Sequence, residues 1–330
     1  MIFSESTALN DALYGKWQAP IQMLLEQNEE ACRQNSLVDK IFHTEKSTHA
    51  MESYTGLTAM DDFAPVGENG AYPKAHMEQS HSKIIENMTW KREFAISQEM
   101  VEDSTTIDFK KQPVQFINAY YRTRERYGAA MLAGAVNGQS TVTFGGRKFD
   151  ATAADGKPLF STSHKNKVDK ATQSNLFSNA LTADALGLAE TAMQNFTGDT
   201  GETLAVAPTV LIIPNDAAMK KAAFQAVGSM DDPAGSNHVW NYQYGRWTIY
   251  VWPYLNKFLA EGVKPWMLLD EDYNELVGSL IWQDRVELTV KSEIDGNDAN
   301  VWKGRARFAA GFNDFRGICC AGITGGTELS

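Results

Sequence analysis

Cysteine is scarce in this sequence, and its three residues are poorly placed for a disulfide framework. Cys32 stands alone, and Cys319 and Cys320 are adjacent, a pair that closes only a strained ring. The chain also lacks an apolar run of about 18 residues, the length that a membrane span requires. Residues 1–17 lack the basic and apolar regions of a signal peptide. These absences predict a cytosolic protein with no membrane anchor.

Motifs for catalysis and cofactor binding are missing too. The sequence has no G-x-S-x-G, G-x-G-x-x-G or G-x-x-x-x-G-K pattern, so it shows neither a serine nucleophile elbow nor a phosphate-binding loop. Ser161, Ser163 and His164 are close in the chain, which favours a polar loop over a catalytic group. The spacing of His76 and His81 fits no standard metal site. We therefore expect a structural or binding protein rather than an enzyme, with no cofactor and no metal.

Positive charge is in the minority. The 30 Lys and Arg residues face 41 Asp and Glu residues, which gives a formal net charge of −11. This balance argues against sequence-specific DNA binding, although it does not exclude an acidic shell that encloses nucleic acid. The 330 residues, 43% of them hydrophobic, predict about two domains with substantial cores.

Residues 113–138 carry the longest regular pattern in the sequence. Apolar residues recur there at spacings of three and four, which predicts one buried stripe on an amphipathic helix. The other side of this helix is polar and contains Asn118, Arg122, Thr123, Glu125 and Arg126. Pro113 suits the first turn, and Gly138 supplies a left-handed stop.

The chain before this helix is helical at first and then extended. Residues 5–34 predict a helical arm, as one helix or as two separated at Pro20, which packs on its own domain or on a neighbouring subunit. Residues 44–92 are polar and rich in Gly and Pro, and we interpret them as a long β-hairpin whose tip lies near residues 61–72. The hairpin has too few large apolar groups for a core of its own. It must therefore lie on something else, and another subunit is the natural candidate. Residues 96–103 predict a short helix.

The chain after the long helix alternates between helix and strand. Residues 141–149 predict a tight hairpin around two glycines. Residues 182–270 predict a compact α/β unit, with a helix capped by Thr182, a buried strand at 209–213, a helix capped by Asn215, and two further strands. Residues 285–290 and 301–308 alternate, which predicts a long antiparallel hairpin.

This order of parts resembles the major capsid proteins of tailed bacteriophages, which have the Hong Kong 97 phage fold. Three stretches are similar to the Mu-like major head subunit: GKPLFSTSH at 156–164, PTVLIIPNDAAMKKA and VWKGRARFAAGF. The resemblance implies an α+β chain made of an N-terminal arm at 1–43, an extended loop at 44–95, a peripheral domain at 96–159 and 278–312 with 113–138 as its spine helix, and an axial α/β domain at 160–277 and 313–330.

The resemblance also implies a function and a set of partners. Hexamers and pentamers of the chain are expected to form an icosahedral virion shell around double-stranded DNA, after assembly in the host bacterial cytoplasm and without a membrane. Because the arm begins close to Met1, the scaffold is expected to be a separate protein; a portal and a decoration protein are further candidate partners.

Particular residues take roles under this resemblance. The extended loop is expected to contact the adjacent subunit through Met60, Phe63, Pro65, Tyr72, Lys74 and Trp90. Arg122, Arg124 and Arg126 are candidates for facing the packaged DNA, and pairing within the chain, such as Arg122 with Glu125, is the alternative.

Two other functions stay open from the sequence. An encapsulin-like nanocompartment shares the arm and the long hairpin but packages a cargo enzyme instead of a genome. A cytosolic enzyme with its site in residues 160–277 belongs to a different class, and it requires a deep pocket with converging titratable groups.

Overall fold

The computed structural model describes residues 2–4, 15–58, 60, 63–68, 70–74, 77–97, 111–231, 240–294, 296 and 299–329, with the backbone alone at 2–4, 15–22, 24 and 57. The chain divides into two compact units. Unit 1 comprises Met1–Glu52, Ile85–Gly128 and Trp282–Ala310, and unit 2 comprises Ser53–Ile84, Ala129–Ile281 and Gly311–Ser330. No helix in the described part of the chain is long and apolar enough to cross a membrane.

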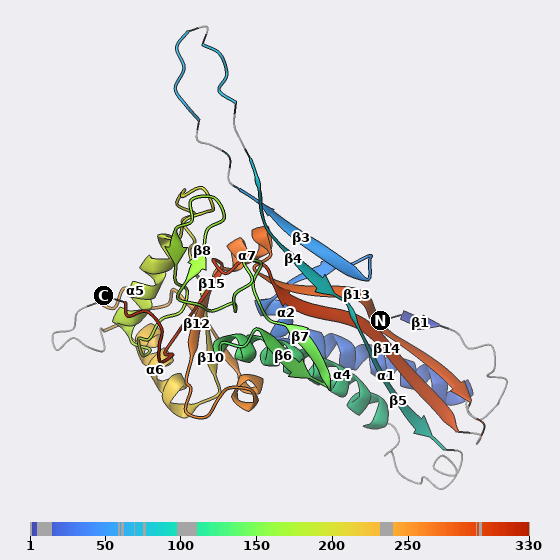
Figure 1. Cartoon of the computed structure of the whole chain (residues 1–330). Helices are drawn as coiled ribbons and strands as arrows, with labels where there is room; N and C mark the ends of the chain where they lie inside the picture. The colour runs from blue at the N-terminus through green and yellow to red at the C-terminus, as the bar shows by residue number, and fades with distance from the viewer. Residues whose placement is uncertain are drawn as a thin grey trace. The chain divides into compact units, whose positions relative to one another are not determined.

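Unit 1 is built on a mixed sheet with the strand order β1-β13-β14-β5, and β2 also pairs with β13 (Figure 1). Its strands and helices are β1 (Ile2–Ser4), α1 (Gly15–Gln34), α2 (Val38–Ile41), β2 (His43–Lys46), β5 (Met88–Ile96), the first part of α4 (Lys111–Val136), and most of β13 (Leu280–Ile294) and β14 (Asn300–Phe312). The long terminal hairpin and the long helix predicted from the sequence are confirmed as β13–β14 and α4.

The core of unit 1 is a group of stacked aromatic side chains between α4 and the sheet. The ring of Phe308 stacks on Trp282 at 5.1 Å and on Trp90 at 4.9 Å, and Tyr127 of α4 packs edge-on against Trp282 at 5.7 Å. Gly304 allows the close approach of α4, because a Cβ atom there would lie 2.4 Å from the ring of Phe116. Several large rings in contact stabilise such a core beyond the area that they bury.

Two charged residues of α4 point into unit 1, although the sequence pattern predicts Glu125 on the polar side of the helix and Arg124 as a candidate for DNA contact. Arg124 is 5% exposed and binds Asp284 and Asp39, both at 2.8 Å, while its guanidinium lies 4.7 Å from the ring centroid of Trp282. Glu125 is 8% exposed and accepts hydrogen bonds from the backbone N–H groups of Leu37 and Val38. Glu125 therefore satisfies the free N–H groups at the start of α2, and the predicted pairing of Glu125 with Arg122 is not formed.

Unit 2 contains a four-stranded sheet with the order β11-β10-β12-β15. β10 pairs in parallel with β11, and β12 is antiparallel to β10 and β15. The elements of unit 2 are most of β3 (Met51–Leu57) and β4 (Gln79–Glu86), the end of α4, β6 (Thr141–Phe144), β7 (Arg147–Asp150), β8 (His164–Lys165), β9 (Thr172–Gln173), α5 (Ala183–Gln194), β10 (Val210–Pro214), α6 (Ala217–Gly228), β11 (Thr248–Trp252), the 3-10 helix η2 (Pro253–Lys257), β12 (Trp266–Leu269), α7 (Glu271–Val277) and β15 (Ile318–Ala321).

The α/β unit predicted at residues 182–270 is confirmed within unit 2, and one of its two predicted helix caps is wrong. Thr182 caps α5 by accepting a hydrogen bond from the N–H of Ala185 at 3.1 Å, as predicted. The cap of α6 is Asp216, whose carboxylate accepts from Ala218 and Met219, and it is not Asn215. Both residues are favoured at caps, so sequence alone did not separate these neighbours.

The other predicted elements have mixed outcomes. The hairpin at 141–149 is confirmed as β6–β7, with Gly145 and Gly146 in the left-handed region. Helix α1 continues through Pro20 as a single helix, so the alternative of two helices at 15–34 is wrong. Residues 5–14 of the predicted arm lie outside the described residues, as does 98–103 of the predicted short helix.

Arg124 and Arg122 provide a matched test of unit 1, because both lie on α4 but only Arg124 is buried. Arg124→Met leaves two carboxylates without their cation, and we expect it to lower the free energy of unfolding by about 3–5 kcal/mol. Arg122→Met changes an exposed position, so we expect a change within about 0.5 kcal/mol. Urea unfolding of both variants checks this prediction, and equal effects would contradict the assignment of Arg124 to the core.

Candidate functional site

The hairpin predicted at residues 44–92 is present over a shorter range as β3 and β4, which pair with each other in a two-stranded sheet. The two ends of the predicted range belong instead to β2, which pairs with β13, and to β5, which pairs with β14. The pairing ends at Thr58, whose N–H donates to the carbonyl oxygen of Glu78 at 2.9 Å, while its hydroxyl accepts from the N–H of Glu78. The described residues between Thr58 and Glu78 form no helix or strand and run as an extended excursion of the chain (Figure 1).

This excursion exposes most of the side chains predicted to contact a neighbour. Phe63 is 101% exposed and Tyr72 is 94% exposed, and Met60, Pro65 and Lys74 are exposed as well. Two further apolar side chains that the sequence reading missed, Val66 and Met77, are also exposed. We call the described residues of 60–78 the hairpin tip. Within the described chain, its large apolar groups lie in solvent.

Trp90 has a different position from the other predicted contact residues. It lies on β5, stacks on Phe308 and donates its indole N–H to the carbonyl oxygen of Phe308 at 3.1 Å. The second half of the hairpin predicted at 44–92 is in fact two strands, because Asn87 separates β4 from β5. Alternation of side chains continues through this break, so the sequence pattern did not show that the chain changes partner strands.

Lys83 attaches the hairpin to β7 and the residues that follow it. Its ammonium group lies 2.6 Å from a carboxylate oxygen of Asp150, 2.6 Å from the carbonyl oxygen of Thr152 and 2.9 Å from the Thr152 hydroxyl. Lys83 is only 5% exposed, and all three of its donors have acceptors. A buried ammonium with this set of partners holds β4 in a defined position within unit 2.

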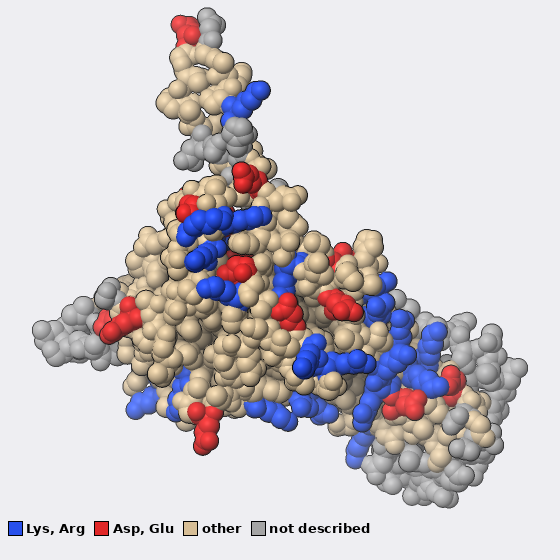
Figure 2. Space-filling view, viewed as in Figure 1, with Lys and Arg blue, Asp and Glu red and all other residues tan. Residues whose placement is uncertain are grey.

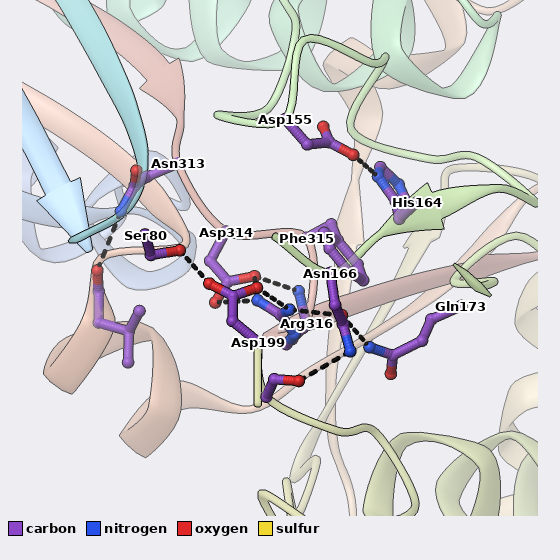
Figure 3. Close-up of polar contacts among 12 residues, drawn as sticks. Ser80, Asp155, His164, Asn166, Gln173, Asp199, Asn313, Asp314, Phe315 and Arg316 are labelled. Atoms are coloured by element: carbon purple, nitrogen blue, oxygen red, sulfur yellow. Dashed lines mark hydrogen bonds and ion pairs between the residues drawn. The ribbon is translucent and has the colours of Figure 1, made fainter. Parts of the chain in front are cut away.

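Ser80 provides the second attachment, through a cluster of buried charges (Figure 3). Its hydroxyl donates to Asp199, which also accepts from the Arg316 guanidinium at 2.9 Å. Arg316 donates further to Asn166 at 2.8 Å and pairs with Asp314 at 3.2 Å. We call Ser80, Lys83, Asp150, Asp199 and Arg316 the attachment cluster. All five lie in unit 2.

The electrostatics of the attachment cluster favour its charged form. Burial raises the pKa of Asp199, but the hydrogen bond from Ser80 and the charge of Arg316 outweigh burial, so this pKa lies below its ordinary value. Burial also raises the pKa of Asp150, and hydrogen bonds from Lys83 and Thr152 outweigh it and lower the pKa. The two carboxyl groups are therefore ionised at neutral pH.

His164 is not part of a catalytic group. The imidazole is fully buried, and its Nδ1 lies 2.6 Å from Asp155, but its Nε2 faces the carbonyl oxygen of Leu159 at 3.2 Å. The ring stacks on Phe315 at 3.9 Å (Figure 3). A serine–histidine–aspartate arrangement needs a hydroxyl at Nε2, so this pair provides packing and orientation without a nucleophile.

Among the described residues, no group of three or more His, Cys, Asp and Glu side chains is placed to hold a metal ion. His76, one of the two histidines considered from the sequence, lies outside the described residues.

The two arginines predicted to face DNA both lie on α4 and line the same hollow. Arg122 is exposed and Arg126 is half-buried, and both line a hollow of about 350 Å³ together with Lys91 and Arg92 of β5. Arg124, which was considered with them, is buried against its two carboxylates and does not reach solvent. No local pattern distinguishes the middle of the three alternating arginines, so its inward direction is not predictable from spacing alone.

Comparison with solved structures shows the fold. The chain matches the capsid of Ralstonia phage GP4 with a TM-score of 0.52 at 10% identity, over 87% of this chain and 90% of that one. It matches the capsid of cyanophage P-SCSP1u with a TM-score of 0.52 at 10% identity, over 87% of this chain and 86% of that one. Both are similar to this chain in fold. No curated protein matches it in sequence.

A sequence profile of the phage capsid protein family matches residues 83–321, which is most of the chain. The match includes β5, α4, the sheet of unit 2 and the terminal hairpin. Together with the fold, it identifies a structural role in the virion capsid, with self-assembly into shells. The chain belongs to the phage capsid protein family and is a major capsid protein with the Hong Kong 97 phage fold.

Proposed function

We propose that the chain assembles as hexamers and pentamers into an icosahedral shell around double-stranded DNA, and that the hairpin tip is its main contact with the adjacent subunit. The observation that carries this proposal is the exposure of Phe63 and Tyr72 on a segment without regular structure. Burial of one such side chain is worth about 1.5–3 kcal/mol. A neighbouring copy that covers the tip gains this energy in every contact of a closed shell.

The attachment cluster supports a mechanical role for the base of the hairpin. A contact at the tip strengthens assembly only if the hairpin has a defined direction, because ordering a loose segment on binding offsets part of the gain. Lys83 and Ser80 fix β4 to unit 2 through Asp150 and Asp199. The base of the hairpin is therefore ordered before the tip contacts a neighbouring subunit, which lowers the entropy cost of that contact.

The proposal includes further partners and a place of assembly. Arg122 and Arg126 face the packaged DNA, and their common hollow with Lys91 and Arg92 supports this role. A separate scaffold protein, a portal and a decoration protein take part, and assembly occurs in the host bacterial cytoplasm.

The proposal also assigns the chain to the Mu-like major head subunit subfamily. Residues 1–43 act as the arm, 44–95 as the extended loop, 96–159 and 278–312 as the peripheral domain, and 160–277 and 313–330 as the axial domain.

Electron microscopy of the purified protein tests the proposed function. We expect closed shells, tubes or capsomers from the chain expressed alone or with the scaffold protein of its own phage. Nuclease treatment followed by analysis of the contents distinguishes enclosed nucleic acid from a specific cargo enzyme, which would indicate a nanocompartment. A monomer or dimer that fails to assemble even with the scaffold would contradict the proposal.

The hairpin tip can be tested with a matched pair of variants. Phe63→Ser with Tyr72→Ser removes the apolar contacts and should abolish shells, while the melting temperature of the dissociated subunit stays unchanged because both side chains are exposed there. Phe63→Leu with Tyr72→Phe keeps most of the apolar area and should retain shells. Deletion of residues 59–73 should also leave a folded subunit without shells. Normal particles from the serine variant would remove the tip from the interface.

The attachment cluster predicts a pH dependence of stability. Because the pKa of Asp199 is lowered in the folded state, its stabilisation is complete above the unfolded value of about 3.9 and is lost as pH falls through the folded value. Asp199→Asn should lower the free energy of unfolding by about 1–3 kcal/mol at pH 7. The difference in melting temperature from the wild type should shrink below about pH 4. Asp184→Asn, at an exposed position of α5, is the control. A difference that is independent of pH would contradict the assignment.

A further inference from the structure

His164 ends the stretch GKPLFSTSH, and the proposed function leaves this buried histidine without a role. Its imidazole is 0% exposed and lies flat on the ring of Phe315, with the ring centroids 3.9 Å apart (Figure 3). A buried polar atom without a hydrogen-bond partner costs free energy, so each of the two ring nitrogens needs a partner of its own.

Both ring nitrogens of His164 face oxygen atoms. Nδ1 lies 2.6 Å from a carboxylate oxygen of Asp155, and Nε2 lies 3.2 Å from the carbonyl oxygen of Leu159. A neutral imidazole has one N–H group and one lone pair, so either neutral tautomer directs its lone pair at one of these two acceptors. The imidazolium form has two N–H groups and donates to both oxygens. The geometry therefore fits a positively charged ring.

Asp155 supplies the matching negative charge, and its carboxylate is only 6% exposed. Burial raises the pKa of Asp155, but the hydrogen bond and the charge of His164, together with the backbone N–H of Lys157 and the charge of His81, outweigh burial. This pKa therefore lies below its ordinary value. Asp155 is ionised at neutral pH and has no proton to donate to Nδ1, so the proton between the two groups belongs to the imidazole.

Two other charged or titratable side chains face this pair. The guanidinium of Arg316 lies 4.7 Å from the centroid of the Phe315 ring, on which the imidazole stacks. Arg316 has its own two aspartates, so Asp155 is left to compensate the charge of His164. His81 of β4 lines the same hollow of about 630 Å³ as Asp155.

Burial distinguishes this pair from ion pairs at the surface. Figure 2 shows Lys and Arg side chains close to Asp and Glu side chains on the face in view. Lys264 and Asp216 form one exposed pair, and water screens such pairs so that each contributes little to stability. His164 and Asp155 are shielded from water, so the loss of either charge leaves the other one buried without compensation.

The His164–Asp155 pair holds a turn that takes part in the attachment of the hairpin. The turn is closed by a β-bridge between Thr152 and Pro158, and Asp155 lies within it. At the start of the turn, the carbonyl oxygen and the hydroxyl of Thr152 accept hydrogen bonds from the ammonium group of Lys83 on β4. His164 thus fixes, through Asp155, the turn that carries two of the three acceptors of Lys83.

We propose that His164 is a buried imidazolium that acts as a positioning residue for the hairpin, and that its deprotonation at alkaline pH loosens the attachment of β4. The effect on shells rests on the proposed function, whereas the charge of His164 is a property of the subunit alone. The folded chain holds a proton that a free imidazole loses above about pH 6.5. The stabilisation is therefore complete below that pH and declines as pH rises above it.

Nuclear magnetic resonance of full-length, dissociated subunits with ¹⁵N-labelled histidine tests the charge at about pH 7.5. We expect one imidazole with protons on both ring nitrogens. Asp155→Asn should convert it to a neutral ring, because the amide can donate to Nδ1 while Nε2 still donates to the carbonyl oxygen of Leu159. This variant keeps the ring and its stacking on Phe315, so the test does not depend on a variant that lacks the histidine. A neutral His164 in the wild type would overturn the inference.

Urea unfolding from roughly pH 6.5 to pH 9 tests the proton count. Relative to Asp155→Asn, the unfolding equilibrium constant of the wild type should rise by up to about tenfold per pH unit. His49→Gln, which changes an exposed histidine, is the control and should keep the wild-type slope. An unchanged slope in Asp155→Asn would overturn the inference. Loss of the slope in His81→Gln would overturn it too, because the titrating group would then be the other histidine that faces Asp155.

Amide exchange and electron microscopy at the same two pH values test the link to the hairpin. At the higher pH, the protection factors of β4 should fall in wild-type subunits while those of β10 stay unchanged, and shells should be lost; Asp155→Asn should behave alike at both values. Equal protection of β4 at both values, or normal shells from subunits with a loosened β4, would overturn the positioning role. If the wild type forms no shells at either pH even with the scaffold, the proposed function fails, and the resonance and exchange data still decide the charge and the loosening.

Discussion

The apolar side chains of the hairpin tip have no cover within the described chain, and much of the structure is organised around that constraint. Phe63 and Tyr72 are almost fully exposed, yet β4 is held to unit 2 by buried Lys83, which pairs with exposed Asp150, and by Ser80, which donates to the buried Asp199–Arg316 pair. In the monomer, contacts within the chain stabilise the base of the hairpin, whereas the hairpin tip lacks such contacts among the described residues. The remaining stabilisation must come from another molecule, which is what a shell subunit provides.

Charge is used differently in different parts of the chain. Arg124 and Arg316 are buried with two aspartates each, where an ion pair adds rigidity more than net stability. At the surface of unit 1, Arg305 of β14 lies opposite Lys91 of β5, whereas Lys303 lies opposite Glu93 and pairs with Glu293. The net charge of −11 conceals this division, because it averages paired and unpaired groups.

Sequence patterns predicted the elements better than their partners. The periodicity of residues 113–138 was enough for α4, and the fold class followed from the order of elements, since both depend on local spacing. The positions of Trp90 and Arg124 were not predictable in this way. Trp90 continues an alternation that crosses from β4 to β5, and Arg124 is buried only because Asp39 and Asp284 arrive from distant parts of the chain. Lys83 and Asp150 are likewise 67 residues apart.

Hydrogen exchange of the hairpin tip shows whether a neighbouring copy covers this segment in the assembled shell. Amide exchange is measured by mass spectrometry for peptides covering residues 60–78 in dissociated subunits and in assembled shells. We expect rapid exchange in the subunit, where the described residues of this segment belong to no helix or strand, and strong protection in the shell, with β10 and β12 protected in both states. Equal, rapid exchange of the tip in both states would contradict the claim that a neighbouring copy covers it.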